Sequence, residues 1–143
     1  DKQSDARLEQ MIHDAGWDDD IYRHFRFIPN DQIQYYFTAC DAVILSYTSN
    51  YIGSSGVLSL ACEYQRPVIA ADVGDLGATV AEYEIGLTFK TQDPQSVRDA
   101  VRRFLLLPQG TIKQFKKRMK QIHRQRSWPN IANRHLAVYC GCS

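Results

Sequence analysis

The chain has 143 residues, of which 44% are apolar, which is enough for one domain with a buried core or for a piece of one. No apolar run approaches the roughly 20 residues that span a bilayer, and no basic-then-apolar signal segment opens the sequence. These features disfavour an integral membrane protein and a secreted one.

The four cysteines do not have the pattern of a disulfide framework. Cys40 and Cys62 fall in predicted helices, where they serve as small apolar residues. Cys140 and Cys142 are two residues apart with no histidine close by, which is weak support for a metal site, so we expect a reduced end. The expected compartment is the reducing cytoplasm.

The net charge of +1 hides a division along the chain. All 16 acidic residues lie in residues 1–99, whereas residues 100–143 contain ten lysines and arginines and no acid. Such asymmetry is typical of a segment that meets an anionic partner, such as a membrane surface or nucleic acid. A solvated helix face, or a tail that folds back on an acidic surface, explains it equally simply, and we favour this explanation.

Apolar periodicity predicts the following elements, with helices written as H and strands as E: H 4–15, E 22–28, H 30–39, E 42–45, H 56–64, E 68–71, H 76–83, E 87–89, H 94–106, H 112–125 and a last helix after residue 129. Pro29 ends the first strand, and Asn30 or Asp31 caps the helix that follows. Asp93 and Pro94 are a cap and a first helical residue. Pro108 and Gly110 are expected to break the chain between the helices on either side.

Several of these elements should be buried. Residues 42–45 are expected to form a strand covered on both faces, and the helix over 56–64 is apolar nearly all round and should be deeply buried. The predicted inward stripes of the other helices are Ile33, Tyr36, Phe37 and Cys40, then Val97, Ala100, Val101 and Phe104, then Ile112, Phe115, Met119 and Ile122.

Strands alternate with helices four times, which predicts parallel strands with crossover helices on both faces. The expected fold class is α/β, a doubly wound, Rossmann-like parallel sheet. Ligands of such sheets bind at the carboxyl ends of the strands. The loops after Ile28, Leu45 and Ala71 should therefore share the binding edge.

The best candidate site is the small-residue turn at Ser54, Ser55 and Gly56, just before a predicted helix. Backbone N–H groups at a helix start, together with the positive end of the helix dipole, suit a phosphate. An ordinary helix cap by Ser55 explains the same residues. The turn is not a phosphate-binding P-loop, because no lysine follows the glycine.

Three further residues are weaker candidates. Gly74 permits positive φ or the close approach of a ligand, although a plain turn before a helix would also use it. Tyr47 and Thr48 follow a strand end and are placed to line a sugar or phosphate pocket, or simply to form a polar rim. No metal site is expected, because the four histidines are scattered and the acidic run over 18–20 lacks flanking ligands.

An ordered series of motifs covers residues 20–138. Its members are Phe27 to Pro29, Ala39 to Tyr47, Ser55 to Leu58 with Ala61, Arg66 to Ala70, Asp72 to Gly74, Gly86 and Leu87, Asp93 and Pro94, and Ser127 with Trp128. This series resembles the retaining glycosyltransferases of the GT-B fold, and family 4, also called group 1, most closely. The resemblance implies that residues 1–143 are a fragment of the C-terminal, nucleotide-sugar-binding domain, with basic helices at about 112–138.

In that family a sugar passes from a nucleotide-diphosphate donor to an acceptor hydroxyl with retention of anomeric configuration. The resemblance implies that the diphosphate is held by the loop and helix start matching Ser54, Ser55, Gly56 and Val57. It places the loop of Ile28 and Pro29 near the base, and we add Tyr47 and Gly74 as candidate donor contacts. No cofactor or metal is implied, because the nucleotide-diphosphate sugar is a substrate, and the acceptor is held largely by a separate N-terminal domain.

Two departures from the family bear on catalysis. The family's paired glutamates, eight positions apart, fall on Ile52 and Leu60, and Glu63 lies one helical turn too late to replace them. The catalytic residue is therefore unassigned. The family's domain also begins with a strand and helix ahead of residue 1, which bear a basic pair for the donor phosphates. Without these and the N-terminal domain, we expect the fragment to be inactive.

The sequence also suggests two other functions. The missing glutamates and the basic tail are compatible with a non-catalytic α/β nucleotide-binding or assembly module. Nucleic-acid binding by the basic helix is disfavoured. Within the glycosyltransferase interpretation, a helix with Phe115, Met119 and Ile122 on one side and cations on the other suits an anionic membrane surface, and a peripheral location at the membrane.

Overall fold

A computed structural model describes residues 2–126 and 128–141. The chain forms two compact units, of which the first ends at Ile33 and the second begins at Gln34. The boundary falls inside helix α2 (Asn30–Ala39), which begins where the sequence predicts it, directly after Pro29.

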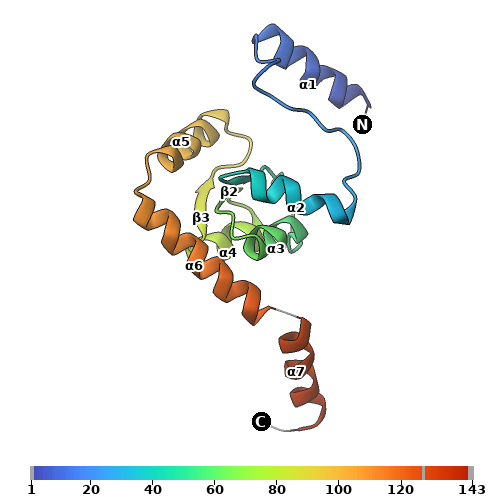
Figure 1. The fold of residues 1–143 in the computed structure, drawn as a ribbon, viewed down its shortest axis with the longest axis vertical. Helices are drawn as coiled ribbons and strands as arrows, with labels where there is room; N and C mark the ends of the chain where they lie inside the picture. The colour runs from blue at the N-terminus through green and yellow to red at the C-terminus, as the bar shows by residue number, and fades with distance from the viewer. Residues whose placement is uncertain (1, 127, 142–143) are drawn as a thin grey trace. The chain divides into compact units, whose positions relative to one another are not determined.

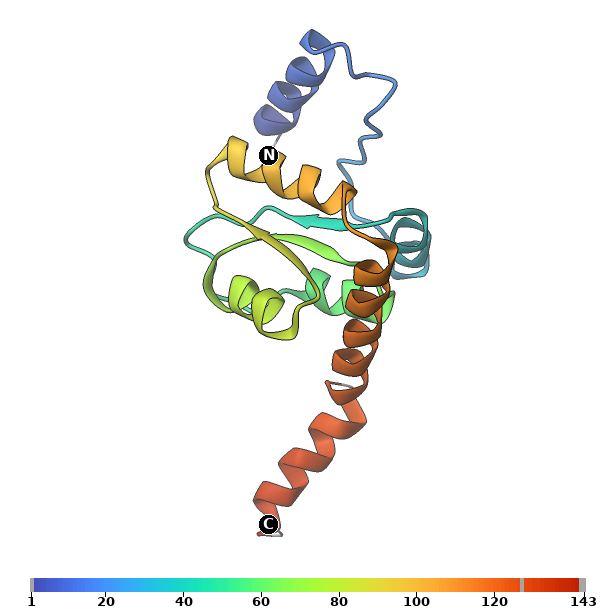
Figure 2. The same cartoon turned by 90° about the vertical axis from the view of Figure 1, so that its left-hand side faces the viewer.

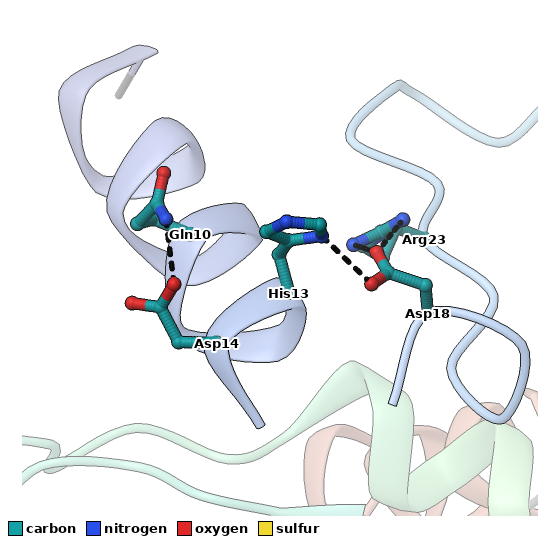
Figure 3. A network of polar contacts seen from close by, with 5 residues as sticks. All are labelled: Gln10, His13, Asp14, Asp18 and Arg23. Carbon is teal, nitrogen blue, oxygen red and sulfur yellow. Dashed lines mark hydrogen bonds and ion pairs between the residues drawn. The ribbon is translucent and has the colours of Figure 1, made fainter. Parts of the chain in front are cut away.

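The first unit consists of helix α1 (Lys2–Asp14) and an irregular segment that follows it. Asp18 fastens this segment to the helix, because its carboxylate lies 3.0 Å from the His13 ring nitrogen Nδ1 and 3.4 Å from the Arg23 guanidinium (Figure 3). Within α1, the amide of Gln10 donates to Asp14 at 2.7 Å. These contacts are exposed, so each contributes little to stability.

The predicted strand over residues 22–28 is wrong. The segment is irregular, and Tyr22 and Phe27 are 90% and 85% exposed. Its apolar residues suggested a strand, but a strand needs a neighbour to pair with its N–H and C=O groups. None of the described residues provides that neighbour. The described sheet consequently has three strands, and not the four that the alternation predicted.

The second unit is built on a parallel sheet in the order β1 (Val43–Leu45), β2 (Val68–Ala71) and β3 (Gly86–Phe89). Helix α3 (Gly56–Glu63) connects the first two strands, and α4 (Gly74–Tyr83) connects the last two. Figure 2 shows α3 and α4 on one face of the sheet and α5 (Pro94–Leu105) on the other. The α/β class, with helices on both faces of a parallel sheet, is thus confirmed.

The core lies between these layers, and β2 is its centre, with all four residues buried. The other buried members are Leu45, Leu58, Ala61, Cys62, Val73, Leu76, Val80, Ile85, Phe89, Ala100, Met119 and Ile122. Burial of this size is the main source of stability in a domain of this kind. The inward stripe of α5 is also confirmed, since Val97, Val101 and Phe104 pack against this core.

Three burial predictions are wrong. Ile44 of β1 is 52% exposed, so that strand is not covered on both faces. Helix α3 buries only the side that faces the core, and Val57 is 38% exposed. Helix α2 has no fully buried residue, and Tyr36 of its predicted stripe is exposed. In each case an apolar or aromatic side chain keeps a large part of its surface exposed.

Helix α6 (Gln109–Gln125) runs past α3 and contacts it (Figure 1). Its predicted stripe is confirmed, because Phe115, Met119 and Ile122 are buried. That burial leaves these three side chains unavailable to a membrane. Gly110 lies within the first turn of α6 and does not break it, so of the two predicted breakers only Pro108 lies between α5 and α6, together with Leu106 and Leu107. Helix α7 (Trp128–Tyr139) follows, and Cys142 lies outside the described residues.

Among the described helices, none is both long enough and apolar enough to cross a membrane.

Candidate functional site

The three strands end together, so the loops that follow them meet at one edge. Leu45 pairs with Ala70, and Ala71 pairs with Phe89, which sets the loops after β1, β2 and β3 side by side. The sequence predicted this edge for the loops after Leu45 and Ala71. Ile28 and Pro29 belong to the first unit, so their proposed role at the base stays a prediction.

Helix α3 begins at this edge with a complete side-chain cap. Ser55 has extended backbone geometry, and its hydroxyl oxygen accepts the Leu58 N–H at 3.1 Å, while its carbonyl accepts the Ser59 N–H at 3.2 Å. Ser55 is 5% exposed, which makes it the one buried polar residue among those described. The interpretation of Ser55 as a helix cap is therefore confirmed.

The cap leaves part of the helix start unoccupied. Among the described residues, no acceptor pairs with the backbone N–H groups of Gly56 and Val57. A Cβ added to Gly56 would meet nothing within 4 Å, so the space beside this residue is open. Two free N–H donors at the positive end of a helix, next to open space, form a site that suits an anion.

A small hollow of about 40 Å³ adjoins this turn. Its walls include Ser54, Ser55, Asp75 and Thr79, together with Arg126 at the end of α6. The Arg126 guanidinium also lies 5.4 Å from the centre of the Tyr83 ring, a cation–π contact that holds it between helices. Arg126 therefore adds a positive charge near the turn, and Asp75 opposes it.

The residues after β1 lie where the sequence suggested a pocket. Tyr47 and Thr48 line a cavity of about 490 Å³ with Thr91 and Asp93, while Phe89, Pro94 and Val97 provide its apolar wall. The Asp93 carboxylate accepts the Ser96 N–H at 3.0 Å and so caps α5, as predicted.

Gly74 has the positive φ that the sequence anticipated, at +45°. It is the first residue of α4 and not a loop residue, because that helix begins two residues earlier than predicted. A Cβ here would lie 2.9 Å from the Tyr51 carbonyl oxygen. The close approach that Gly74 permits is therefore an approach of the chain to itself, and its contact with a donor stays a prediction.

Sequence reasoning missed three residues that support the site. The Tyr51 ring stacks on Tyr47 with centroids 4.1 Å apart, and the Thr91 hydroxyl donates to the Tyr47 carbonyl at 2.9 Å. Arg126 falls within the basic helices predicted at about 112–138, and nothing in that pattern distinguishes it from its neighbours. Nothing in the local sequence links Thr91 or Arg126 to the turn, since the fold alone brings them there.

The structure gives the burial of the two residues at the positions that the resemblance assigns to the family's paired glutamates. Ile52 is 87% exposed beside the turn, and Leu60 is half-buried in α3. Among the described residues, no group of three or more His, Cys, Asp or Glu side chains is arranged to hold a metal ion.

Comparison with known proteins identifies the family. The family model described as "Glycosyl transferases group 1" matches residues 1–128. The chain belongs to this family. Over 136 residues it is 29% identical to a D-inositol 3-phosphate glycosyltransferase of Corynebacterium urealyticum. This alignment covers 92% of the present chain and 30% of that protein.

The fold has a counterpart among solved structures. Sucrose-phosphate synthase from Thermosynechococcus elongatus matches with a TM-score of 0.74 and 24% identity, over 95% of this chain and 33% of that one. This likeness shows that the group 1 chain has the α/β fold of a GT-B glycosyltransferase domain. The chain spans about a third of the length of both proteins.

Proposed function

We propose that residues 1–143 belong to the donor-binding domain of a glycosyltransferase, with α6 and α7 as its basic C-terminal helices. The substrate is a nucleotide-diphosphate sugar, and the sugar passes to an acceptor hydroxyl with retention. Family membership supports the class of reaction. Because the chain spans about a third of its relatives, we propose that an N-terminal domain of the same protein holds most of the acceptor.

One observation carries the proposed donor site, namely the unpaired N–H groups of Gly56 and Val57 beside open space. When the bond between the sugar and the diphosphate breaks, negative charge grows on the departing phosphate oxygen. Fixed N–H donors and the positive end of the helix dipole stabilise that charge more than they stabilise the intact donor. Ser54 and Arg126 line the adjoining hollow and add a hydroxyl and a positive charge.

The proposed donor site can be tested by closing the open space. Gly56→Val places a branched side chain beside the two N–H groups, and we expect the intact protein to bind nucleoside diphosphates about 100-fold more weakly, since charge-assisted hydrogen bonds to the phosphate are lost. Titration calorimetry with UDP, GDP and ADP measures this. Gly110→Val is the matched control, because Gly110 lies in the first turn of α6 with nothing within 4 Å of its Cβ position.

Equal affinity of the Gly56→Val and Gly110→Val variants would contradict the donor site. Transfer assays on the same variants separate an enzyme from a binding module. An enzyme that binds through this turn loses transfer in Gly56→Val alone. A wild-type protein that binds a nucleoside diphosphate but neither transfers nor hydrolyses any nucleotide sugar would instead be a non-catalytic module, for which Ile52 and Leu60 at the acid positions argue.

We also propose that α6 touches an anionic membrane surface. Lys113, Lys117, Lys120 and Arg124 recur at helical spacing along its exposed side, and no acid follows Asp99 in the chain. Just before α6, Leu105 and Leu106 are 75% and 83% exposed. Exposed leucines and a cationic helix face are both features that favour binding to an anionic lipid interface, whereas exposed leucines do not contribute to nucleic-acid binding.

Vesicle co-sedimentation tests this surface. The intact protein should pellet with vesicles of 30% phosphatidylserine at low salt, and binding should fall steeply when Lys113, Lys117 and Lys120 become Glu, at about 1 kcal/mol for each charge lost. Binding of this triple variant equal to that of the wild type, or no wild-type binding at all, would remove the proposal.

A further inference from the structure

The strongest unassigned contact in the site joins the two ends of the loop that precedes α3. The Tyr47 hydroxyl lies 3.1 Å from Ser55 Oγ, so one hydrogen bond spans the seven intervening residues. Ser55 Oγ simultaneously accepts the Leu58 N–H at 3.1 Å. The end of β1 is therefore tied, through one buried hydroxyl, to the first turn of the helix that offers the free N–H groups.

Tyr47 is itself held from two other directions. Its carbonyl oxygen accepts a hydrogen bond from the Thr91 hydroxyl at 2.9 Å, which links it to the loop after β3. Its ring stacks on Tyr51 at 4.1 Å with an interplanar angle of 13°. The Tyr51 carbonyl lies against Gly74, at the end of the loop after β2. Tyr47 thus connects all three strand ends at the binding edge.

We propose that Tyr47 is a positioning residue, which fixes the N–H groups of Gly56 and Val57 before a diphosphate arrives. This inference rests on the proposed function. A positioning role replaces the expectation that Tyr47 touches the donor. Its hydroxyl already forms a hydrogen bond with Ser55 Oγ, and its ring already stacks on the Tyr51 ring. A loop that is ordered in advance loses less conformational entropy on binding, and its donors stay aligned with the phosphate.

The change Tyr47→Phe keeps the stacked ring and removes only the hydroxyl. We expect nucleoside diphosphate binding to weaken about fivefold, the usual effect of one hydrogen bond, while binding of the corresponding nucleoside is unchanged. The selective loss of the diphosphate is the decisive readout, because a merely structural role would weaken both ligands alike. Tyr64→Phe is the matched control, since Tyr64 stacks on Phe37 at the opposite end of α3.

A double-mutant cycle in the intact protein identifies the partner. In the Ser55→Ala background, Tyr47→Phe should cause no further loss of diphosphate affinity, because the hydrogen bond is already gone. Additive losses, or a Tyr47→Phe variant that binds diphosphate as tightly as the wild type, would overturn the inference. If Gly56→Val weakens diphosphate binding and Tyr47→Phe does not, only this inference fails. If Gly56→Val has no effect, the donor site fails and this inference fails with it.

Discussion

Helices α3 and α4 begin at the same edge of the sheet, and each begins with a glycine, yet the two glycines have opposite surroundings. Gly56 of α3 follows a buried serine cap, and the space beside it is open. Gly74 of α4 follows Val73, which makes no side-chain cap, and the Tyr51 carbonyl closes its Cβ side. Gly56 therefore leaves access for a ligand, whereas Gly74 lets the chain pack on itself.

A second glycine of α4 gives a large expected effect on stability. A Cβ on Gly77 would lie 2.8 Å from the Asp72 Cα, a backbone atom that cannot move aside cheaply. We expect Gly77→Ala to lower the free energy of unfolding by about 2 to 3 kcal/mol. Urea denaturation measures the change. The free energy of unfolding of Gly56→Ala should lie within about 0.5 kcal/mol of the wild-type value, because the added Cβ has no atom within 4 Å. Similar stabilities of the two variants would contradict the close packing of Gly77 against Asp72.

The cap of α3 gives an intermediate effect. Ser55→Ala removes the oxygen that accepts the Leu58 N–H and the partner of the Tyr47 hydroxyl. We expect a loss of about 1 to 2 kcal/mol in the free energy of unfolding, as for other helix caps. Thermal denaturation followed by circular dichroism checks this. An unchanged midpoint would mean that the cap does not fix the start of α3.

The buried side of α3 affects the reactivity of a thiol. Burial raises the pKa of the Cys62 thiol from 9.0 to about 11, partly offset by the charge of Arg126. At pH 8 its thiolate fraction should therefore be about 100-fold below that of an unperturbed thiol. A disulfide reagent should label exposed Cys140 first and Cys62 only after unfolding. Equal labelling rates in the native protein would contradict the burial of this face.

The same pKa shift has a consequence for stability at high pH. A thiol whose folded-state pKa is raised favours the folded state fully below pH 9, and this contribution is lost as the pH rises from about 9 to about 11. The free energy of unfolding should fall over this window in the wild type. In the Cys62→Ala variant the free energy of unfolding should fall less steeply with pH. Identical slopes for the variant and the wild type would show that the thiol is not buried in solution.

Much of the fold could be predicted from local patterns. Asp93 with Pro94 fixed the start of α5, and the apolar run over residues 68–71 identified the central strand, because caps and buried strands leave signals within a few residues. The strand predicted over residues 22–28 was wrong for the converse reason. Their apolar pattern is local, but a strand exists only if a neighbour pairs with it, and that depends on distant residues.

The site was predictable in part for the same reason. Ser55 and Gly56 are adjacent in sequence, so their cap and free N–H groups follow from a local pattern. Tyr47 and Thr91 are brought together by the parallel pairing of strands that lie far apart in the chain. No spacing rule predicts a contact between them. For the same reason the open side of Gly56 and the closed side of Gly74 could not be distinguished before the fold was known.

The most direct test of the diphosphate site is an NMR titration of the intact protein with its tightest-binding nucleoside diphosphate. The backbone amide resonances of Gly56 and Val57 should show the largest shifts, and that of Gly110, in the first turn of α6, should not move. Large shifts at Gly74 and Asp75 of α4, with Gly56 and Val57 unchanged, would contradict the assignment of the site to the start of α3.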